Sequence, residues 1–140
     1  MNGSALSVLG ILLLIFIAEP SLACSCAYKT IEERFDEADY AFTAEVIAAK
    51  IDLDPDIEYR TTGEKVLITI GSARNYKGDS SELKELYTYS SAGACGVAIT
   101  VARAYTFLVN KNGQVHLCGS VVGKEEWREF RILLMRRGLN

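Results

Sequence analysis

The chain has 140 residues, of which 15 are basic and 18 acidic, so its formal net charge is −3. This acidic balance argues against a nucleic-acid partner, because such partners require a basic surface. Apolar residues make up 49% of the chain and only two prolines occur, so we expect a folded domain rather than a disordered segment.

The first residues have the pattern of a secretory signal peptide. An almost wholly apolar run over Leu6–Ala18 is followed by Glu19-Pro20 and by the small residues Ser21 and Ala23 before the expected cut. A helix of that length spans about 20 Å, short of the roughly 30 Å hydrocarbon core, which disfavours a membrane anchor. We therefore predict a signal peptide over residues 1–23 and one secreted domain over residues 24–140, with no membrane association of the mature form.

A second interpretation of the same junction is a bacterial lipoprotein site at Ala23-Cys24. Ser21 stands where such sites usually carry leucine, so cleavage without lipidation is favoured. The distinction matters because lipidation would block the amine of Cys24.

A helix is predicted directly after the N-terminal cysteines. Thr30 and Glu33 form a capping-box pattern, and Ile31, Phe35 and Ala38 follow at helical spacing. The pattern predicts a helix that begins after Thr30.

Strands with apolar residues at alternate positions are predicted next, five in all. Val66, Ile68 and Ile70 share one face of the second strand, and Asn112-Gly113 is a hairpin signal between the last two. The alternating set of the first strand is Phe42, Ala44, Val46 and Ala48. The strands fall within residues 40–50, 64–78 and 83–91 and, as a pair, within residues 105–119. Five short antiparallel strands are enough to close a small barrel.

A second helix is predicted over residues 124–138, with Gly138 as its stop signal. One face of this helix carries four large apolar residues, Trp127, Phe130, Leu133 and Leu134. The sequence thus predicts a mainly β domain with a helix near each end.

The four cysteines, Cys24, Cys26, Cys95 and Cys118, indicate two disulfides in an oxidising compartment. Three pairings are possible, and a Cys24–Cys26 bond would need a strained ring, so both N-terminal cysteines are expected to be tied to the distant body. The alternative is a zinc or copper site built from Cys24, Cys26, His116 and Cys118, which would leave Cys95 unpaired. Outside such a site, His116 is predicted to be a strand residue.

Several stretches, taken together and in this order, resemble the N-terminal inhibitory domain of the tissue inhibitors of metalloproteinases, within the netrin-module superfamily. The resemblance implies a five-stranded Greek-key barrel of the oligonucleotide/oligosaccharide-binding type with flanking helices, and the disulfides Cys24–Cys95 and Cys26–Cys118. Counterparts of the family's third disulfide and second domain are not expected in this sequence. The stretches are Cys24-Ser25-Cys26, "FDEADYAFTAEV", "ITIGSARNYKG", "LYTYSSAGACG", "YTFLV" and "HLCGSVVGKEEW".

The resemblance also implies a function, that of a secreted inhibitor of zinc metalloendopeptidases. The α-amine and carbonyl of Cys24 would chelate the zinc of the protease, and the inhibitor would need no cofactor of its own. The chain is not expected to be an enzyme, since it has one histidine and neither a Gly-x-Ser-x-Gly nor a His-Glu-x-x-His motif. The implied protease-binding residues are Cys24, Ser25, Cys26, Ala27, Gly93, Ala94 and Cys95.

Other interpretations stay open at this point. A netrin-type module could bind extracellular matrix or a receptor through its barrel surface and inhibit nothing. Ser25 could be a small spacer and Gly93-Ala94 a simple turn. The loop Lys50–Lys65 could add protease contacts or form a solvated acidic hairpin.

Overall fold

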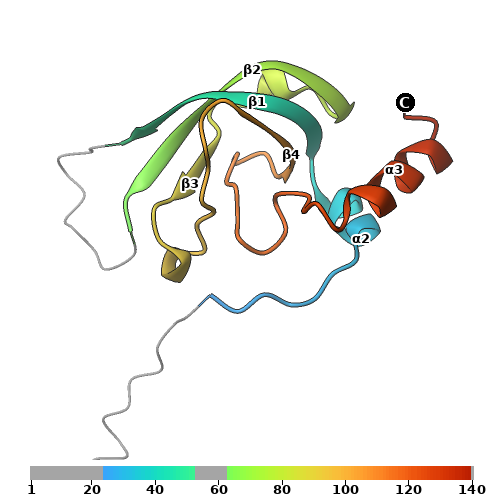
Figure 1. The fold of residues 1–140 in the computed structure, drawn as a ribbon, viewed down its shortest axis with the longest axis horizontal. Coiled ribbons are helices and arrows are strands. Elements are labelled where there is room, and N and C mark those ends of the chain that lie inside the picture. The colour runs from blue at the N-terminus through green and yellow to red at the C-terminus, as the bar shows by residue number, and fades with distance from the viewer. Residues whose placement is uncertain (1–23, 53–62, 140) are drawn as a thin grey trace, which may run out of the picture.

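The computed structural model describes residues 24–52 and 63–139, which form a curved antiparallel sheet flanked by two helices (Figure 1). The predicted signal peptide and most of the loop after Ile51 lie outside these residues. Within the described part, no helix is long and apolar enough to cross a bilayer. The elements in chain order are α2 (Ile31–Glu37), β1 (Tyr40–Ile51), β2 (Lys65–Lys77), η1 (Ser80–Glu82), β3 (Tyr87–Tyr89), η2 (Ala92–Ala94), β4 (Arg103–Val109) and α3 (Trp127–Arg136).

The first helix begins where its capping box predicts. The Thr30 backbone N–H donates to Glu33 Oε2 at 2.7 Å, and the Glu33 backbone N–H donates to Thr30 Oγ1 at 3.2 Å. These reciprocal bonds satisfy two donors that a helix start otherwise leaves unpaired. Hydrogen bonding to Thr30 lowers the pKa of the Glu33 carboxyl, which keeps the cap charged.

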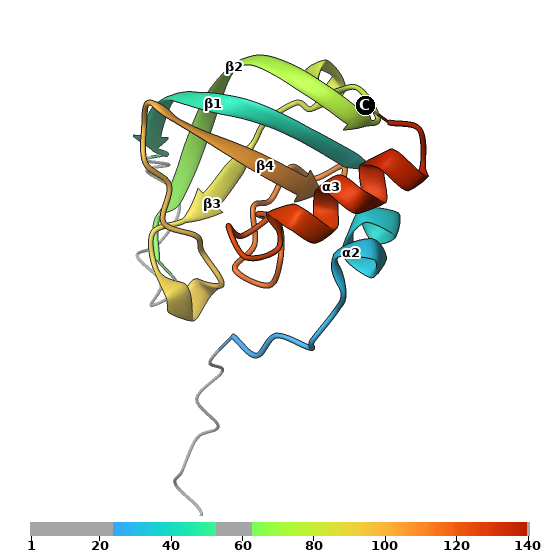
Figure 2. The ribbon, with the colours of Figure 1, turned by 45° about the vertical axis from the view of Figure 1, so that its right-hand side comes forward.

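The sheet has the strand order β3-β2-β1-β4, and every neighbouring pair is antiparallel. Register shifts along β1 and β2 bend the long hairpin that these strands form. The sheet therefore curls into a half-barrel, which is seen from the side in Figure 2.

Successive residues of β1 and β4 contribute to two separate cores. On β1, Phe42 belongs to the core enclosed by the curled sheet, whereas its neighbour Ala41 packs under the helices. On β4, Phe107 and Leu108 divide in the same way. Because side chains alternate across a strand, this division requires apolar residues at consecutive positions wherever both faces are covered.

The predicted buried face of the first strand ends earlier than expected. Phe42, Ala44 and Val46 are buried, but Ala48 is exposed, contrary to the prediction. The register shifts on both sides of Val46 turn the strand, so its last residues project beyond the core as a two-stranded ribbon.

The fifth predicted strand is not present among the described residues, which contain four strands. Gly113 makes the predicted turn, with its N–H donating to the Asn110 carbonyl at 2.9 Å, but the chain does not pair with β4 directly after this turn. Instead Val115 donates to the Tyr87 carbonyl of β3 at 2.7 Å. Only glycine fits at position 113, because a Cβ there would collide with the carbonyl oxygen of Glu85.

This irregular segment, residues 110–122, spans the open side of the curled sheet. After its contact with β3 it reaches β4, where the Leu108 N–H donates to the Ser120 carbonyl and the Val122 N–H to the Thr106 carbonyl, at 2.8 and 3.0 Å. The segment thus connects both edge strands of the sheet, and it carries Cys118 across the gap between them.

The predicted C-terminal helix is present and packs against the outer face of the sheet. Phe130 is fully buried, and its ring contacts those of Phe35 and Tyr76 at centroid distances of 6.2 and 5.6 Å. Trp127 begins the helix at the rim of this core, where it remains 39% exposed and stacks on Phe130. The predicted apolar face is therefore confirmed apart from its first residue.

Phe130→Ala should cost about 3–5 kcal/mol of unfolding free energy, because it removes the ring on which three aromatic neighbours pack. Thermal or denaturant unfolding of the purified domain measures the change. Ile132→Ala on the same helix is the control. Because Ile132 is 43% exposed, this substitution should lower the unfolding free energy by no more than about 0.5–1 kcal/mol. Equal losses for the two variants would contradict the assigned core.

Candidate functional site

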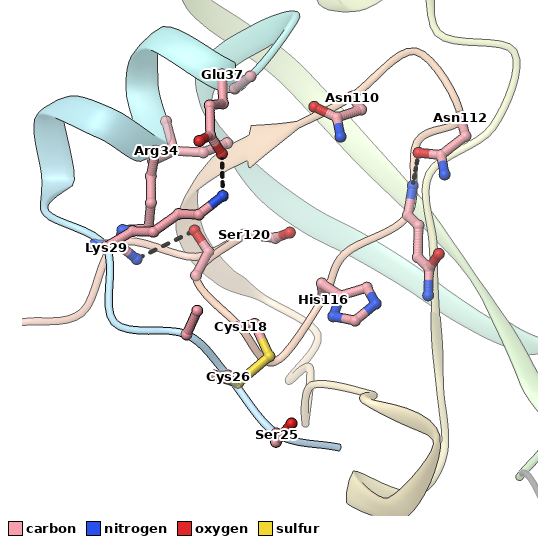
Figure 3. A pocket seen from close by; sticks show the side chains of 15 residues that line it. Ser25, Cys26, Lys29, Arg34, Glu37, Asn110, Asn112, His116, Cys118 and Ser120 are labelled. Atoms are coloured by element: carbon pink, nitrogen blue, oxygen red, sulfur yellow. Dashed lines mark hydrogen bonds and ion pairs between the residues drawn. A yellow bond between two sulfur atoms is a disulfide. The ribbon is translucent and has the colours of Figure 1, made fainter. Parts of the chain in front are cut away.

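The candidate site is built on the N-terminal segment, residues 24–30, which contains no helix or strand. Cys24 is half-buried, and the next three residues, Ser25, Cys26 and Ala27, are exposed. Figure 3 shows this segment running past the 110–122 segment before it enters α2. A chain end of this kind is expected to be poorly ordered unless other contacts hold it.

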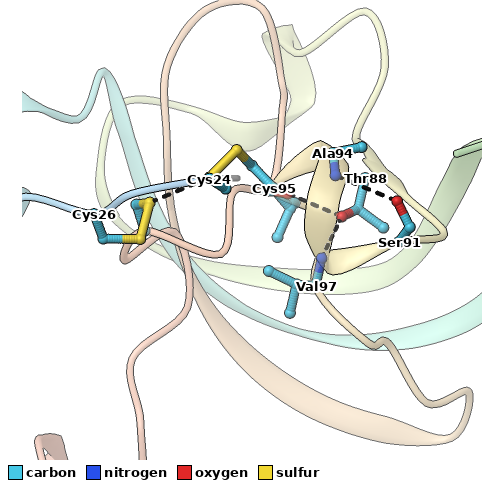
Figure 4. Close-up of a disulfide and its surroundings, with 9 residues drawn as sticks. Cys24, Cys26, Thr88, Ser91, Ala94, Cys95 and Val97 are labelled. Carbon is cyan, nitrogen blue, oxygen red and sulfur yellow. Dashed lines mark hydrogen bonds between the residues drawn. A yellow bond between two sulfur atoms is a disulfide. The ribbon is translucent and has the colours of Figure 1, made fainter. Parts of the chain in front are cut away.

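Two disulfides supply those contacts. Cys24 is bonded to Cys95 and Cys26 to Cys118, with Cα–Cα distances of 5.4 and 5.1 Å. These are the pairs that the family resemblance implies. The two bonds are adjacent, because Cys24 Sγ lies 3.8 Å from Cys118 Sγ (Figure 4).

The first anchor, Cys95, lies at the end of a short turn that begins at Ser91. The Ser91 hydroxyl accepts a hydrogen bond from the Ala94 N–H at 3.2 Å, which caps η2. Cys95 then adopts the left-handed conformation, with φ of 61°, and directs the chain back toward the sheet. Gly93 is exposed on this turn and Ala94 is half-buried. The disulfide therefore joins the N-terminal segment directly to the turn that contains both residues.

The buried side chain of Thr88 fastens the turn to the body of the domain. Its hydroxyl accepts from the Val97 N–H at 2.8 Å and donates to the Val115 carbonyl at 2.9 Å. Thr88 is only 2% exposed, so water competes little for these bonds. One hydroxyl thus links β3, Val97 just beyond the turn, and the segment that carries the second anchor.

The two anchor segments are also bonded to each other. The Leu117 N–H donates to the Cys95 carbonyl at 2.8 Å, one residue before Cys118. The disulfides therefore attach the N-terminal segment to a single hydrogen-bonded unit instead of two independent loops.

A pocket of about 300 Å³ lies beneath the N-terminal segment, between it, α2 and the 110–122 segment (Figure 3). Lys29 lines it and forms an ion pair with Glu37 of α2 at 2.5 Å. His116 also lines the pocket and is not in a strand, contrary to the prediction. The other side chains named in Figure 3 are Ser25, Cys26, Arg34, Asn110, Asn112, Cys118 and Ser120.

The alternative of a zinc or copper site finds its residues close together but chemically changed. The side-chain ligand atoms of Cys24, Cys95 and His116 lie within 4.8 Å of one another, as do those of Cys24, Cys26 and Cys118. All four cysteines are in disulfides, so their sulfurs cannot act as thiolate ligands. This arrangement does not fit a resident metal.

Nothing in the sequence indicated two residues, Thr88 and Arg34, whose side chains bond to the segments around the site. Thr88 lies in a strand where nothing distinguishes it from a surface threonine, and Arg34 has the pattern of an ordinary solvated helix residue. Both act through partners far away in the chain, with separations of 27 residues for Thr88–Val115 and 85 for Arg34–Gly119. No local sequence signal could have identified them.

Comparison with known proteins adds a second line of evidence. The chain is 29% identical, over 121 residues, to metalloproteinase inhibitor 2 of Canis lupus familiaris, Homo sapiens and Rattus norvegicus. The match covers 81% of this chain. The chain is thus similar in sequence to metalloproteinase inhibitors. No protein-family model matches it.

The relation to this inhibitor family confirms the resemblance seen in the sequence motifs. The relatives are named as inhibitors and not as enzymes, in agreement with the expectation that this chain is not an enzyme. The chain spans about half the length of the curated relatives it matches, since the aligned part covers 54% of each.

Peptide mapping of the secreted protein without reduction should recover Cys24–Cys95 and Cys26–Cys118 and no other pair. An alkylating reagent added to the folded protein should label none of the four cysteines, and each should be labelled after reduction and unfolding. Crossed pairs, or thiols that are released together with a bound metal, would contradict this arrangement and restore the metal-site interpretation.

Proposed function

We propose that the mature chain is a secreted inhibitor of zinc metalloendopeptidases that binds the catalytic zinc of the protease through its N-terminal residue, Cys24. One observation carries the proposal: two adjacent disulfides attach an exposed N-terminal segment to the domain. Support also comes from the relatives, which are named metalloproteinase inhibitors.

The chemistry follows from the ligands that a free N-terminus offers. A catalytic zinc in a protease keeps one coordination position for the water that attacks the substrate. Cleavage after Ala23 would free the α-amine of Cys24, and this amine and the carbonyl of the same residue can form a five-membered chelate ring. Chelation displaces the water, so the protease loses its nucleophile.

The disulfides have a mechanical role in this proposal. The sulfur atom of Cys24 is not a ligand, because it is bonded to the sulfur of Cys95. Binding a flexible chain end would cost the free energy of ordering it, and cross-links that fix its conformation beforehand reduce that cost. Residues 24–27, which we call the wedge, are fixed at two of their four positions.

The remaining residues of the wedge provide specificity. Ser25, exposed between the two anchored cysteines, enters the pocket on the primed side of the protease site, and Ala27 follows it along the cleft. Gly93 and Ala94 form the second part of the contact edge, since the Cys24–Cys95 bond ties their turn to the wedge.

We also propose that the fold derives from the five-stranded Greek-key barrel of the family. The 110–122 segment would take the place of the fifth strand, and its hydrogen bonds to both edge strands support this assignment. Secretion, with extracellular zinc metalloproteases as partners, follows from the predicted signal peptide over residues 1–23.

The central test changes only the N-terminal amine. Mature protein with one extra N-terminal alanine, or with the amine of Cys24 acetylated, should form the same two disulfides and unfold at the same temperature. Both forms should lose most inhibition, because the amine is displaced or converted to a non-basic amide. The measurement is residual cleavage of a peptide substrate by a secreted zinc metalloprotease at a fixed concentration of the chain.

Native-like inhibition by both modified forms would rule out chelation by Cys24. A netrin-type module that binds matrix or a receptor would then be the better interpretation. Unmodified protein prepared in parallel is the control for folding and activity.

Substitution at Ser25 tests the specificity role. A larger side chain should change the order in which a panel of zinc metalloproteases is inhibited, while the melting temperature stays nearly constant because Ser25 is exposed. Ser25→Gly should weaken inhibition of most members of the panel. If every protease is affected equally, or if the melting temperature falls sharply, Ser25 is a spacer.

A further inference from the structure

Arg34 makes an unusual set of contacts behind the wedge. It belongs to α2, yet its side chain is only 10% exposed and reaches two segments that are distant in sequence. Its Nη1 donates to the Gly119 carbonyl at 3.2 Å, and its Nη2 is paired with Glu126 next to the start of α3. A single guanidinium thus connects α2, the end of the 110–122 segment and α3.

Gly119 leaves room for the Arg34 side chain because it has no Cβ. Its φ of 101° is a conformation that residues with a side chain rarely adopt. A Cβ at this position would lie 2.8 Å from Arg34 Nη1 and closer still to the stem of the arginine. The backbone at Gly119 therefore lies directly against Arg34, one residue after Cys118.

Glu126 completes the arrangement. Its carboxylate pairs with Arg34 and accepts the Gly123 N–H at 2.9 Å, so it holds the loop before α3 as well. Burial tends to raise the pKa of Glu126, but the hydrogen bonds from Arg34 and Gly123 outweigh it, and the pKa lies below its ordinary value. The pair is therefore charged on both sides at neutral pH.

A gain in folding stability does not explain why Arg34 makes these contacts. Partly buried ion pairs often add little net stability, because both charges lose water. The Nε of Arg34 is buried without a hydrogen-bond partner among the described residues, which adds a further cost. A second arginine, Arg137, already joins α3 to α2 on the surface through Asp36 and Glu32, at 2.5 and 3.1 Å.

We propose that Arg34 is a positioning residue for the wedge: by holding the backbone at Gly119 it fixes Cys118 and, through the Cys26–Cys118 disulfide, the direction of residues 24–27. Cys118 also contacts the sulfur of Cys24, so both anchored positions of the wedge depend on where Cys118 stands. The effect on inhibition rests on the proposed function, whereas the effect on the position of the 110–122 segment does not.

The test compares the same substitution at two arginines. Arg34→Met keeps an unbranched side chain but removes every donor. Arg137→Met is the matched control because it cuts α2–α3 ion pairs at the C-terminal end of α3. We expect both variants to form the two disulfides and to have lower melting temperatures. Only Arg34→Met should weaken inhibition, by about tenfold or more, which corresponds to about 1.4 kcal/mol of binding free energy.

Hydrogen exchange of the Leu117 amide, which donates to the Cys95 carbonyl, provides a readout that does not depend on inhibition. Exchange at Leu117 should be faster in Arg34→Met and unchanged in Arg137→Met. If unmodified protein inhibits no zinc metalloprotease, the proposed function fails, and this exchange alone decides the positioning role. Identical exchange in all three proteins, or equal loss of inhibition by both variants, would overturn the proposal.

Arg34→Lys is the conservative variant, and it carries the test if Arg34→Met does not form both disulfides. Lysine can pair with Glu126, but its single ammonium cannot reproduce the fork that holds Glu126 and the Gly119 carbonyl together. We therefore expect recovery of the melting temperature without recovery of inhibition or of slow exchange at Leu117. Full recovery of all three would show that only the charge matters and would overturn the positioning role.

Discussion

The rest of the site depends on one covalent constraint, the attachment of two nearly consecutive residues at the start of the domain to two neighbouring points of its body. Each disulfide closes a long loop, with sequence separations of 71 and 92 residues, so each restricts the unfolded chain and typically adds about 2–4 kcal/mol of stability. A single bond would still let the chain end pivot. Two adjacent bonds also fix its direction, and Ser25 is exposed between them.

Two anchors are useful only if they keep a constant separation, and the irregular 110–122 segment provides this. It is hydrogen-bonded to β3 at one end and to β4 at the other, and Leu117 donates to the residue that bonds Cys24. The buried Thr88 hydroxyl bonds to this segment and to Val97, and Arg34 of α2 donates to the Gly119 carbonyl at its other end. The half-barrel therefore acts as a rigid frame for a short exposed chain end.

The sequence predicted the parts of this frame that depend on local signals. The capping box at Thr30, the apolar alternation of β1 and the helix face around Phe130 each follow from neighbours a few residues apart. The prediction of a fifth strand was wrong because, after the turn at Gly113, the chain first bonds to Tyr87 of β3, a residue far away in the sequence, instead of pairing at once with β4.

Only part of the candidate site could be predicted from the sequence. Cysteine spacing and motif resemblance indicated the wedge and its partners, whereas Arg34 and Thr88 act over long sequence separations and leave no local pattern. Contacts of this kind become visible only once the strands have been placed against one another.

The most direct measurement of the central claim is a crystal structure of the mature chain bound to a secreted zinc metalloprotease. We predict that the amine nitrogen of Cys24 lies about 2.0–2.1 Å from the zinc, with the carbonyl oxygen of the same residue as a second ligand and no water in that position. Ser25 should enter the adjoining pocket of the protease. A complex in which the zinc keeps its water and the chain binds through another surface would contradict the account.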